Sequence, residues 1–286
     1  MNGILMPIIT GIASGFILYL SAAGMNLMIS GLGVVNFGQG AFFVMGAGIC
    51  LAVGSLSNSL AAGILAGAAA TFLAGGILEL MLRPVVGKKL ELTLMITIGV
   101  TYILQDVYEL IWSGSVKTLP APQFLRGAVR FSGIVIPKYL LFTIVVSSLI
   151  AFGLWIVFEK TRLGIVFRAI IDNRNMTECL GKDVQTTYML MFMIGIALSG
   201  IAGGLNLPIS KFDANGSMSI FSSIVPIIVI GGLGNIQGTL PAAILVGALN
   251  AVVALAMPTM YNFVPIVLMV ICIIFKPQGL FTKRRR

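Results

Sequence analysis

Two amide side chains, Asn36 and Gln39, interrupt a stretch of the chain that is otherwise apolar. They lie in the segment Asn36-Phe37-Gly38-Gln39-Gly40-Ala41, whose glycines leave backbone donors and acceptors open to a ligand. Polar residues within long apolar segments are costly and usually face a bundle interior or a cavity. Neutral amides suit weak, transient binding, because a fixed charge would hold an ionised ligand too firmly. We therefore predict that Asn36 and Gln39 line a pathway, with Gln105 as a further polar contact; the alternative is that the segment only packs helices.

The chain offers little for enzymatic chemistry. It contains no histidine, which excludes the HExxH zinc motif and catalysis by Ser-His-Asp or Cys-His groups. The three cysteines, Cys50, Cys179 and Cys272, lack the spacing of a metal site or of a disulfide framework. The Gly87-Lys88-Lys89 segment fails the phosphate-binding P-loop pattern. The sequence therefore predicts a protein that is not an enzyme, with no metal, no cofactor and no ATPase site of its own.

The composition is that of a chain embedded in lipid. Hydrophobic residues make up 58% of the 286 residues, charged residues only 9%, and the mean hydropathy is +1.06. Soluble domains carry roughly 25% charged residues, so this chain could not cover a water-facing surface. We predict an all-α, polytopic transmembrane bundle that forms a single domain over residues 1–286, with spans of the length a bilayer demands. The candidate spans are residues 4–28, 34–54, 58–82, 92–113, 139–158, 187–208, 220–236, 238–257 and 262–276.

Glycine marks two places where these spans are expected to break. The stretches 29–40 and 226–241 are rich in glycine and contain polar residues, so each is predicted to be a broken or re-entrant helix, and the total is eight to ten membrane segments. Ile29-Ser30-Gly31-Leu32-Gly33 is echoed by Ile230-Gly231-Gly232-Leu233-Gly234, which is compatible with an internal repeat or with chance. Glycines four residues apart, such as Gly11 and Gly15, indicate close helix packing in lipid.

The distribution of positive charge predicts the orientation. With nine crossings and the C-terminus inside, 13 of the 18 lysines and arginines fall in inside loops and 5 in outside loops. This bias satisfies the positive-inside rule and places the N-terminus outside. The net charge of +9 is therefore interpreted as an orientation signal rather than as a nucleic-acid interface.

Two of the predicted loops stand out by their length. The outer loop, 114–138, contains three prolines and is predicted to be irregular or to form short strands. The inner loop, 159–186, places Val166, Phe167, Ile170 and Ile171 at helical spacing among charges. This pattern predicts a short amphipathic helix near the membrane face, followed by a polar helical turn around Glu178.

The chain resembles the integral membrane subunits of branched-chain amino acid ABC importers of the Liv type. The resemblance rests on the order and spacing of several short motifs: Gly33-Val34-Val35-Asn36-Phe37 with Gly40-Ala41, Arg83-Pro84, Leu104-Gln105, Gly164 with Arg168-Ala169, Leu180-Gly181, Gly195 to Gly204, Gly231-Gly232-Leu233-Gly234 with Gly238, and Pro277-Gln278-Gly279-Leu280-Phe281. Many relatives carry a histidine where this chain has Gln39. Relatives also include urea and short-amide importers, so the substrate stays open.

The resemblance implies a permease subunit in the plasma (inner) membrane of a bacterium, forming the translocation path for branched-chain or related small amino acids. It implies a homologous second permease subunit, two cytoplasmic ATPase subunits that bind ATP and Mg²⁺, a soluble substrate-binding protein and membrane lipid as partners, and no nucleic acid. The 159–186 loop would then couple to an ATPase. The residues expected to carry this contact are Gly164, Arg168, Ala169, Glu178 and Gly181.

The sequence leaves two alternative functional classes. A secondary transporter driven by an ion gradient would be favoured by paired carboxylates near the membrane midplane, and the central parts of the candidate spans contain few. An intramembrane enzyme would need a nucleophile–base pair that the sequence does not offer. Neighbouring genes for P-loop ATPases and a secreted binding protein would separate the importer from both.

We predict that the 83–89 and 159–186 loops and the C-terminus are cytoplasmic and that the 114–138 loop is external, because inside loops collect positive charge. Single cysteines at positions 172 and 286 should therefore resist a membrane-impermeant thiol reagent applied to intact cells. A cysteine in the 114–138 loop should react. Strong external labelling at position 172 or 286 would reverse the orientation.

Overall fold

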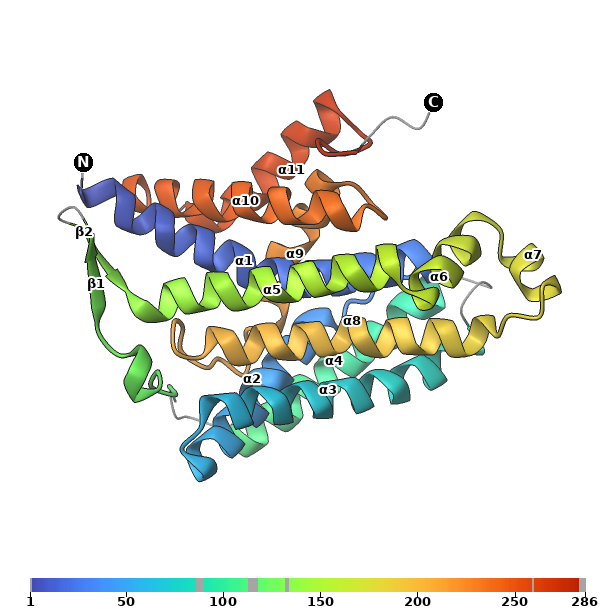
Figure 1. The fold of residues 1–286 in the computed structure, drawn as a ribbon, viewed down its shortest axis with the longest axis horizontal. Helices are drawn as coiled ribbons and strands as arrows, with labels where there is room; N and C mark the ends of the chain where they lie inside the picture. The colour runs from blue at the N-terminus through green and yellow to red at the C-terminus, as the bar shows by residue number, and fades with distance from the viewer. Residues whose placement is uncertain (1, 86–89, 113–117, 132–133, 259, 283–286) are drawn as a thin grey trace.

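The computed structural model describes residues 2–85, 90–112, 118–131, 134–258 and 260–282, and almost all of this is helix (Figure 1). Seven helices are long and apolar enough to cross a membrane, which confirms the polytopic helical class. They are α1 (Asn2–Leu32), α2 (Gln39–Ser57), α3 (Leu60–Leu82), α4 (Leu90–Trp112), α5 (Lys138–Lys160), α8 (Val184–Asn206) and α10 (Ile236–Ala256). Two apolar helices, α9 (Ser217–Gly231) and α11 (Val264–Phe275), are shorter, so the expected eight to ten segments are reached only by counting them.

The helices break within the two glycine-rich stretches, 29–40 and 226–241, where breaks were predicted. Between α1 and α2 the chain is non-helical over 33–38, and Gly33 has φ +65°. Between α9 and α10, Gly232 and Gly234 have φ values of +98° and +82°. Side chains with a Cβ rarely adopt this left-handed region, so glycine permits both sharp reversals. Gly232 and Gly234 therefore form a turn between the two helices.

The bundle is organised around α1 and α8. Helix α1 packs against α10, α8 and α5, while α8 also packs against α2 and α3. In an 18-residue apolar stretch of α8, 72% of the residues are buried, against 17% in the corresponding stretch of α4, which lies at the periphery. The aliphatic and aromatic core lies mainly on these central helices, and the exposed apolar faces of α3, α4 and α5 are suited to lipid.

The two loops lie at opposite ends of the bundle (Figure 1). One end carries the N-terminus and an antiparallel hairpin of β1 (Ala128–Phe131) and β2 (Ile134–Pro137), preceded by the 3₁₀ turn η1 (Gln123–Leu125). This hairpin confirms short strands in the 114–138 loop. The other end carries α6 (Arg162–Asp172) and α7 (Arg174–Cys179), the predicted amphipathic helix and polar turn. A further 3₁₀ turn, η2 (Tyr261–Phe263), precedes α11.

Glycine contacts let the central helices touch through their backbones. A Cβ placed on Gly46 of α2 would collide with the backbone of Gly200 of α8, and one on Gly67 of α3 would come 2.7 Å from the Gly46 carbonyl oxygen. Lipid provides no hydrophobic drive for helix association, so close packing of this kind must hold the bundle together.

We predict that Gly46→Ala lowers the unfolding midpoint of the purified protein in detergent. The new methyl group must separate α2 from α8, and overpacking of this kind costs about 1–3 kcal/mol. The matched control is Gly153→Ala on α5, where a Cβ would meet nothing within 4 Å. That change should be neutral or stabilising by up to about 1 kcal/mol. Equal midpoints for the two variants would contradict the packing account.

Candidate functional site

Asn36 and Gln39 lie together at the break between α1 and α2, and both are fully buried. Asn36 Oδ1 accepts a hydrogen bond from the Gly38 backbone N–H at 2.9 Å. Asn36 Nδ2 donates to Gln39 Oε1 at 3.4 Å. Asparagine stabilises turns by bonding to the backbone two residues on, so Asn36 both forms this turn and orients Gln39.

Gln39 joins three helices through one amide group. Its Nε2 lies 2.6 Å from Ser199 Oγ, 3.0 Å from the Ser21 carbonyl oxygen and 3.2 Å from the Gly195 carbonyl oxygen. The hydroxyls of Ser21 and Ser199 are hydrogen-bonded to each other. In this conformation the amide is therefore satisfied by α1 and α8, and it contacts neither of the two cavities described below.

Gln105 belongs to a different part of the molecule. It lies on α4, and its Nε2 donates to Asn215 Oδ1 at 2.7 Å, in the connection between α8 and α9. The structure thus brings Asn36 and Gln39 together and places Gln105 in a separate contact. A role for these three residues in a pathway stays a prediction.

A second buried network centres on Asn26 of α1, a residue that the sequence reasoning missed. Asn26 Nδ2 donates to Thr239 Oγ1 at 2.8 Å, and Asn26 Oδ1 accepts from the Gly234 backbone N–H at 2.7 Å. The amide therefore ties α1 to the break between α9 and α10. An asparagine in the middle of an apolar run was the signal that could have found it.

Helix α6 is amphipathic: one of its faces is buried against the bundle and the opposite face is exposed. Thr161 caps its first turn by accepting a hydrogen bond from the Gly164 N–H. Phe167 and Ile170 are buried against the bundle, whereas Arg168 and Ala169 are exposed. Gly164 lies against the backbone of Phe158 with no space for a side chain, so glycine sets the tight angle between α5 and α6.

Arg168 is anchored within the chain. Its Nη1 donates to the Phe158 carbonyl oxygen at the end of α5 and forms an ion pair with Glu159 Oε2 at 3.0 Å. The other oxygen, Glu159 Oε1, accepts from Gln237 Nε2 at 3.1 Å. Arg168, Glu159 and Gln237 thus connect α6, α5 and α10. They line a groove of about 580 Å³ between these helices and α1.

Helix α7 carries the remaining predicted coupling residues. Asn173 caps it by accepting from the Met176 N–H, and Glu178 pairs with Arg174 at 3.0 Å. Gly181, with φ +72°, ends the turn that follows. Glu178 and Arg168 therefore belong to separate ion pairs.

At the start of α8, hydrogen bonds from the side chain and backbone of Thr186 hold the pKa of the exposed Asp183 carboxyl below its usual value.

Within the described residues, no group of three or more His, Cys, Asp or Glu side chains is placed to hold a metal ion. Among the described residues, the buried carboxylate of Glu79 forms an ion pair with Arg83 at 3.1 Å. The polar groups at the two helix breaks are neutral: amides, hydroxyls and backbone carbonyls. Such groups can bind and release a small polar solute, and they do not form a catalytic constellation.

A multi-pass helical bundle with a helical loop at one end and neutral polar groups buried at its helix breaks has the architecture of a membrane transport subunit. Residues 8–273 match the family described as branched-chain amino acid transport system / permease component. Because the match covers most of its length, the chain belongs to this family of ABC permease subunits, which lack ATPase activity.

Similar proteins match over nearly their whole length. The chain is 27% identical to the high-affinity branched-chain amino acid transport system permease protein BraD of Pseudomonas aeruginosa, over 96% of this chain and 95% of that protein. It is 26% identical to the probable LivH permease of Methanocaldococcus jannaschii, over 92% and 88%. It is 24% identical to LivH of Escherichia coli K12, over 96% and 94%. No solved structure gives a significant match.

We predict that Gln39→Leu lowers both stability and uptake per folded complex. Losing the amide removes the donor to the Ser21 and Gly195 carbonyl oxygens and to Ser199 Oγ, and a lost buried hydrogen bond of this kind costs about 1–3 kcal/mol. Thr143→Val is the control, because Thr143 is also fully buried but donates only within α5, to the Tyr139 carbonyl. Uptake of radiolabelled leucine should be divided by the amount of assembled complex. If uptake falls only in step with folded protein, the Asn36–Gln39 segment is a packing element.

Proposed function

We propose that this chain forms, with a homologous second permease subunit, the translocation path of an ATP-driven importer for branched-chain or related small amino acids. Two cytoplasmic ATPase subunits would bind ATP and Mg²⁺, and a soluble binding protein would deliver the substrate. The observation that carries the proposal is the family match over residues 8–273, together with the projecting α6–α7 segment on which a partner ATPase could act. We further propose a bacterial plasma-membrane location, with the C-terminus cytoplasmic and the N-terminus outside.

The α6–α7 segment is suited to dock on an ATPase. It exposes large apolar side chains in a polar loop: Ile165 is 57% exposed, Met176 63% and Leu180 70%. An amphipathic helix that projects such residues is a common way to fill a groove on a partner protein. Arg168 and Glu178, at the edge of this surface, would fix its register through charge-assisted hydrogen bonds.

The contacts of α6 would also transmit a displacement of this helix to other helices of the bundle. Displacement of α6 would act on α5 through the Arg168–Glu159 pair and on α10 through the Glu159–Gln237 hydrogen bond. Helix α10 packs along α1, which carries Ser21 and Asn26. A push from the ATPase would therefore reach the two buried amide networks through packed helices.

The passage itself is proposed to involve Asn36, Gln39 and Gln105. In the conformation described, the Gln39 amide is occupied by protein acceptors. Its availability to a zwitterion would thus require α1, α2 and α8 to separate during the cycle. A secondary transporter is disfavoured, because the family match assigns the chain to an ATP-driven system and the buried Glu79 is already paired with Arg83.

We predict that Arg168→Glu abolishes coupled transport while the complex still assembles and hydrolyses ATP. The charge-swapped variant, Glu159→Arg with Arg168→Glu, re-forms the ion pair between α5 and α6. It loses the hydrogen bonds to the Phe158 carbonyl and from Gln237, and it reverses the charge that faces the ATPase. It should stay uncoupled. The measurements are leucine uptake and binding-protein-stimulated ATP hydrolysis in proteoliposomes, after co-purification has identified the partner chains. Unchanged coupling in Arg168→Glu would remove the residue from the mechanism. Rescue by the swap would limit Arg168 to holding α6 against α5.

A further inference from the structure

The groove of about 580 Å³ that Arg168 borders, here called the α5–α10 groove, runs between α5 and α10 with α1 as its floor and α6 across one end. Both α5 and α10 pack on α1 (Figure 1). On α5 the lining residues extend from Ser148, near the middle of the helix, to Glu159 near its end. This stretch of helix is about 16 Å long at about 1.5 Å per residue. The hydrocarbon core of a bilayer is about 30 Å thick, so the groove is about as long as one leaflet of that core is deep.

The walls of the α5–α10 groove suit a hydrocarbon chain. Six aromatic side chains from α1, α5 and α6 line it: Phe16, Tyr19, Phe152, Trp155, Phe158 and Phe167. Phe152 is 58% exposed and Trp155 42%, on the face of α5 that is suited to lipid, whereas Phe16 lies deeper, at the floor. Tryptophan is enriched where a helix meets the membrane interface, and Trp155 lies one turn before Glu159. The groove therefore opens to the bilayer along α5 and reaches inward to α1.

The charged residues of the groove gather at its α6 end. Arg168, Glu159 and Asp172 line it there, all with exposed side chains, and the Lys160 ammonium lies 5.8 Å from the centre of the Trp155 ring. The neutral polar residues at the same end are Ser30, Asn235 and Gln237. In its bonds to described residues Arg168 donates through Nη1, which leaves Nε and Nη2 as donors. Two cations and two carboxylates thus form a neutral mouth with both donors and acceptors to offer.

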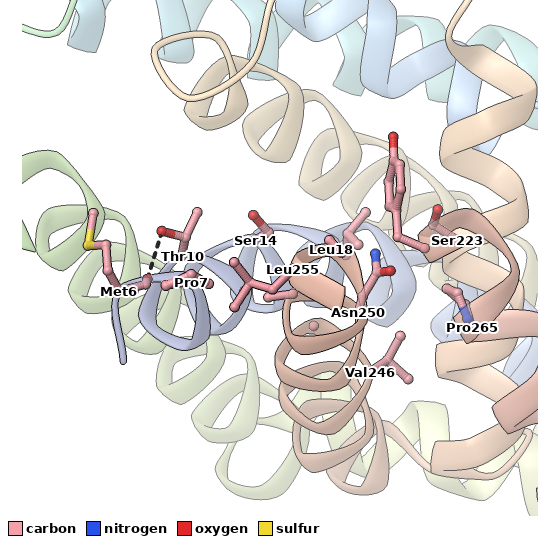
Figure 2. A pocket seen from close by; sticks show the side chains of 15 residues that line it. Met6, Pro7, Thr10, Ser14, Leu18, Ser223, Val246, Asn250, Leu255 and Pro265 are labelled. Atoms are coloured by element: carbon pink, nitrogen blue, oxygen red, sulfur yellow. Dashed lines mark hydrogen bonds between the residues drawn. The ribbon is translucent and has the colours of Figure 1, made fainter. Parts of the chain in front are cut away.

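The cavity at the other end of the bundle has no such mouth. It has a volume of about 440 Å³ and lies between the N-terminal half of α1 and the C-terminal half of α10, with Leu18, Val246 and Leu255 in its wall (Figure 2). Its polar lining residues include Ser14 and Asn250, and the described part of its wall holds no Lys, Arg, Asp or Glu. A charged headgroup would therefore find partners in the α5–α10 groove and not in this cavity.

We propose that the α5–α10 groove binds one glycerophospholipid with a phosphoethanolamine headgroup, from the cytoplasmic leaflet. An acyl chain lies along the aromatic walls, the phosphate accepts from Arg168 Nε and Nη2, and the ammonium group donates to the carboxylates of Glu159 and Asp172. One phosphate charge and one ammonium charge match the neutral mouth. Phosphatidylglycerol has no ammonium group for the carboxylates, and the trimethylammonium group of phosphatidylcholine has no N–H to donate. The choice of leaflet rests on the proposed function, which places α6 on the cytoplasmic side.

A branched-chain amino acid carries the same two charges, but it matches only part of this groove. Its short side chain would cover the end next to α6 and leave the apolar wall near Phe16 and Phe152 without a partner. A lipid fills the whole length between α5 and α10. Its headgroup then lies on the Arg168–Glu159 pair, which joins α6 to α5. The lipid therefore occupies the contact through which α6 acts on the bundle.

Photo-crosslinking tests the site in the complete importer, reconstituted in vesicles of phosphatidylcholine and phosphatidylglycerol with a trace of one phospholipid that carries a diazirine in its acyl chain. Phe16 on α1 and Leu240 on α10 are diagnostic, because both line the groove and neither is on an exposed face. The phosphatidylethanolamine probe should label them roughly fivefold more than the phosphatidylglycerol or phosphatidylcholine probe, the equivalent of about 1 kcal/mol. Leu65, which is 70% exposed on α3, should be labelled equally by all three. Equal labelling of Phe16 and Leu240 by the three probes, or none, would overturn the proposal.

Two neighbouring positions on α5 provide matched variants. Ser148 lines the groove, whereas Leu149 is 64% exposed and is not among the lining residues. Ser148→Phe would fill the deep end of the groove and should lower labelling of Phe16 by the phosphatidylethanolamine probe roughly fivefold. Leu149→Phe should leave it unchanged. Equal labelling in the two variants would contradict the site. The comparison of the three probes needs no variant, so it decides the question even where Ser148→Phe does not assemble.

Two measurements in the same vesicles separate other outcomes. Excess leucine should leave the labelling of Phe16 and Leu240 unchanged, and displacement of the probe by leucine would assign the groove to the solute and overturn the lipid site. Labelling requires neither ATP nor transport. Selective labelling in vesicles that take up no branched-chain amino acid would therefore remove the proposed function and keep the lipid site.

Discussion

Backbone-to-backbone contact at glycines is the constraint on which the rest of this structure depends. Lipid does not drive helices together as water does, so α1, α2, α8 and α10 must approach closely enough for dispersion forces and short polar contacts to hold them. The crossing of α1 and α8 shows the limit, since a Cβ on Gly195 would lie 2.6 Å from the Gly24 carbonyl oxygen. Only at this separation can the Gln39 amide reach carbonyls on both helices.

The buried amides follow from the same geometry. A helix break frees backbone groups that lipid cannot satisfy. At the α1–α2 break the Gly38 N–H donates to Asn36 Oδ1, and at the α9–α10 break the Gly234 N–H donates to Asn26 Oδ1. These networks are neutral, so they can exchange partners at modest cost. Fixed ion pairs inside the bundle would resist such exchange.

Charge is instead concentrated at the end of the bundle that carries α6 and α7. There the pairs of Arg168 with Glu159 and Arg174 with Glu178 hold short helices in place at partly exposed positions. Exposed pairs of this kind contribute little to stability, so their main effect is to orient the apolar residues that α6 and α7 present. The buried amide networks are therefore neutral, whereas the α6–α7 end presents charged side chains beside exposed apolar ones.

Hydropathy and glycine spacing in the sequence determined the helical class, the nine apolar segments, both helix breaks and the helix at 162–172, because bilayer thickness and backbone sterics act on local stretches of chain. The same reasoning grouped Asn36 and Gln39 with Gln105, but could not tell which of them meet. Tertiary packing decided that Gln39 bonds to α8, that Gln105 bonds to Asn215, that Asn26 bridges to Gly234, and that Asn250 is left with an unused acceptor. Hydrogen bonds between residues 110 to 208 positions apart depend on how helices cross, and no local pattern encodes that crossing.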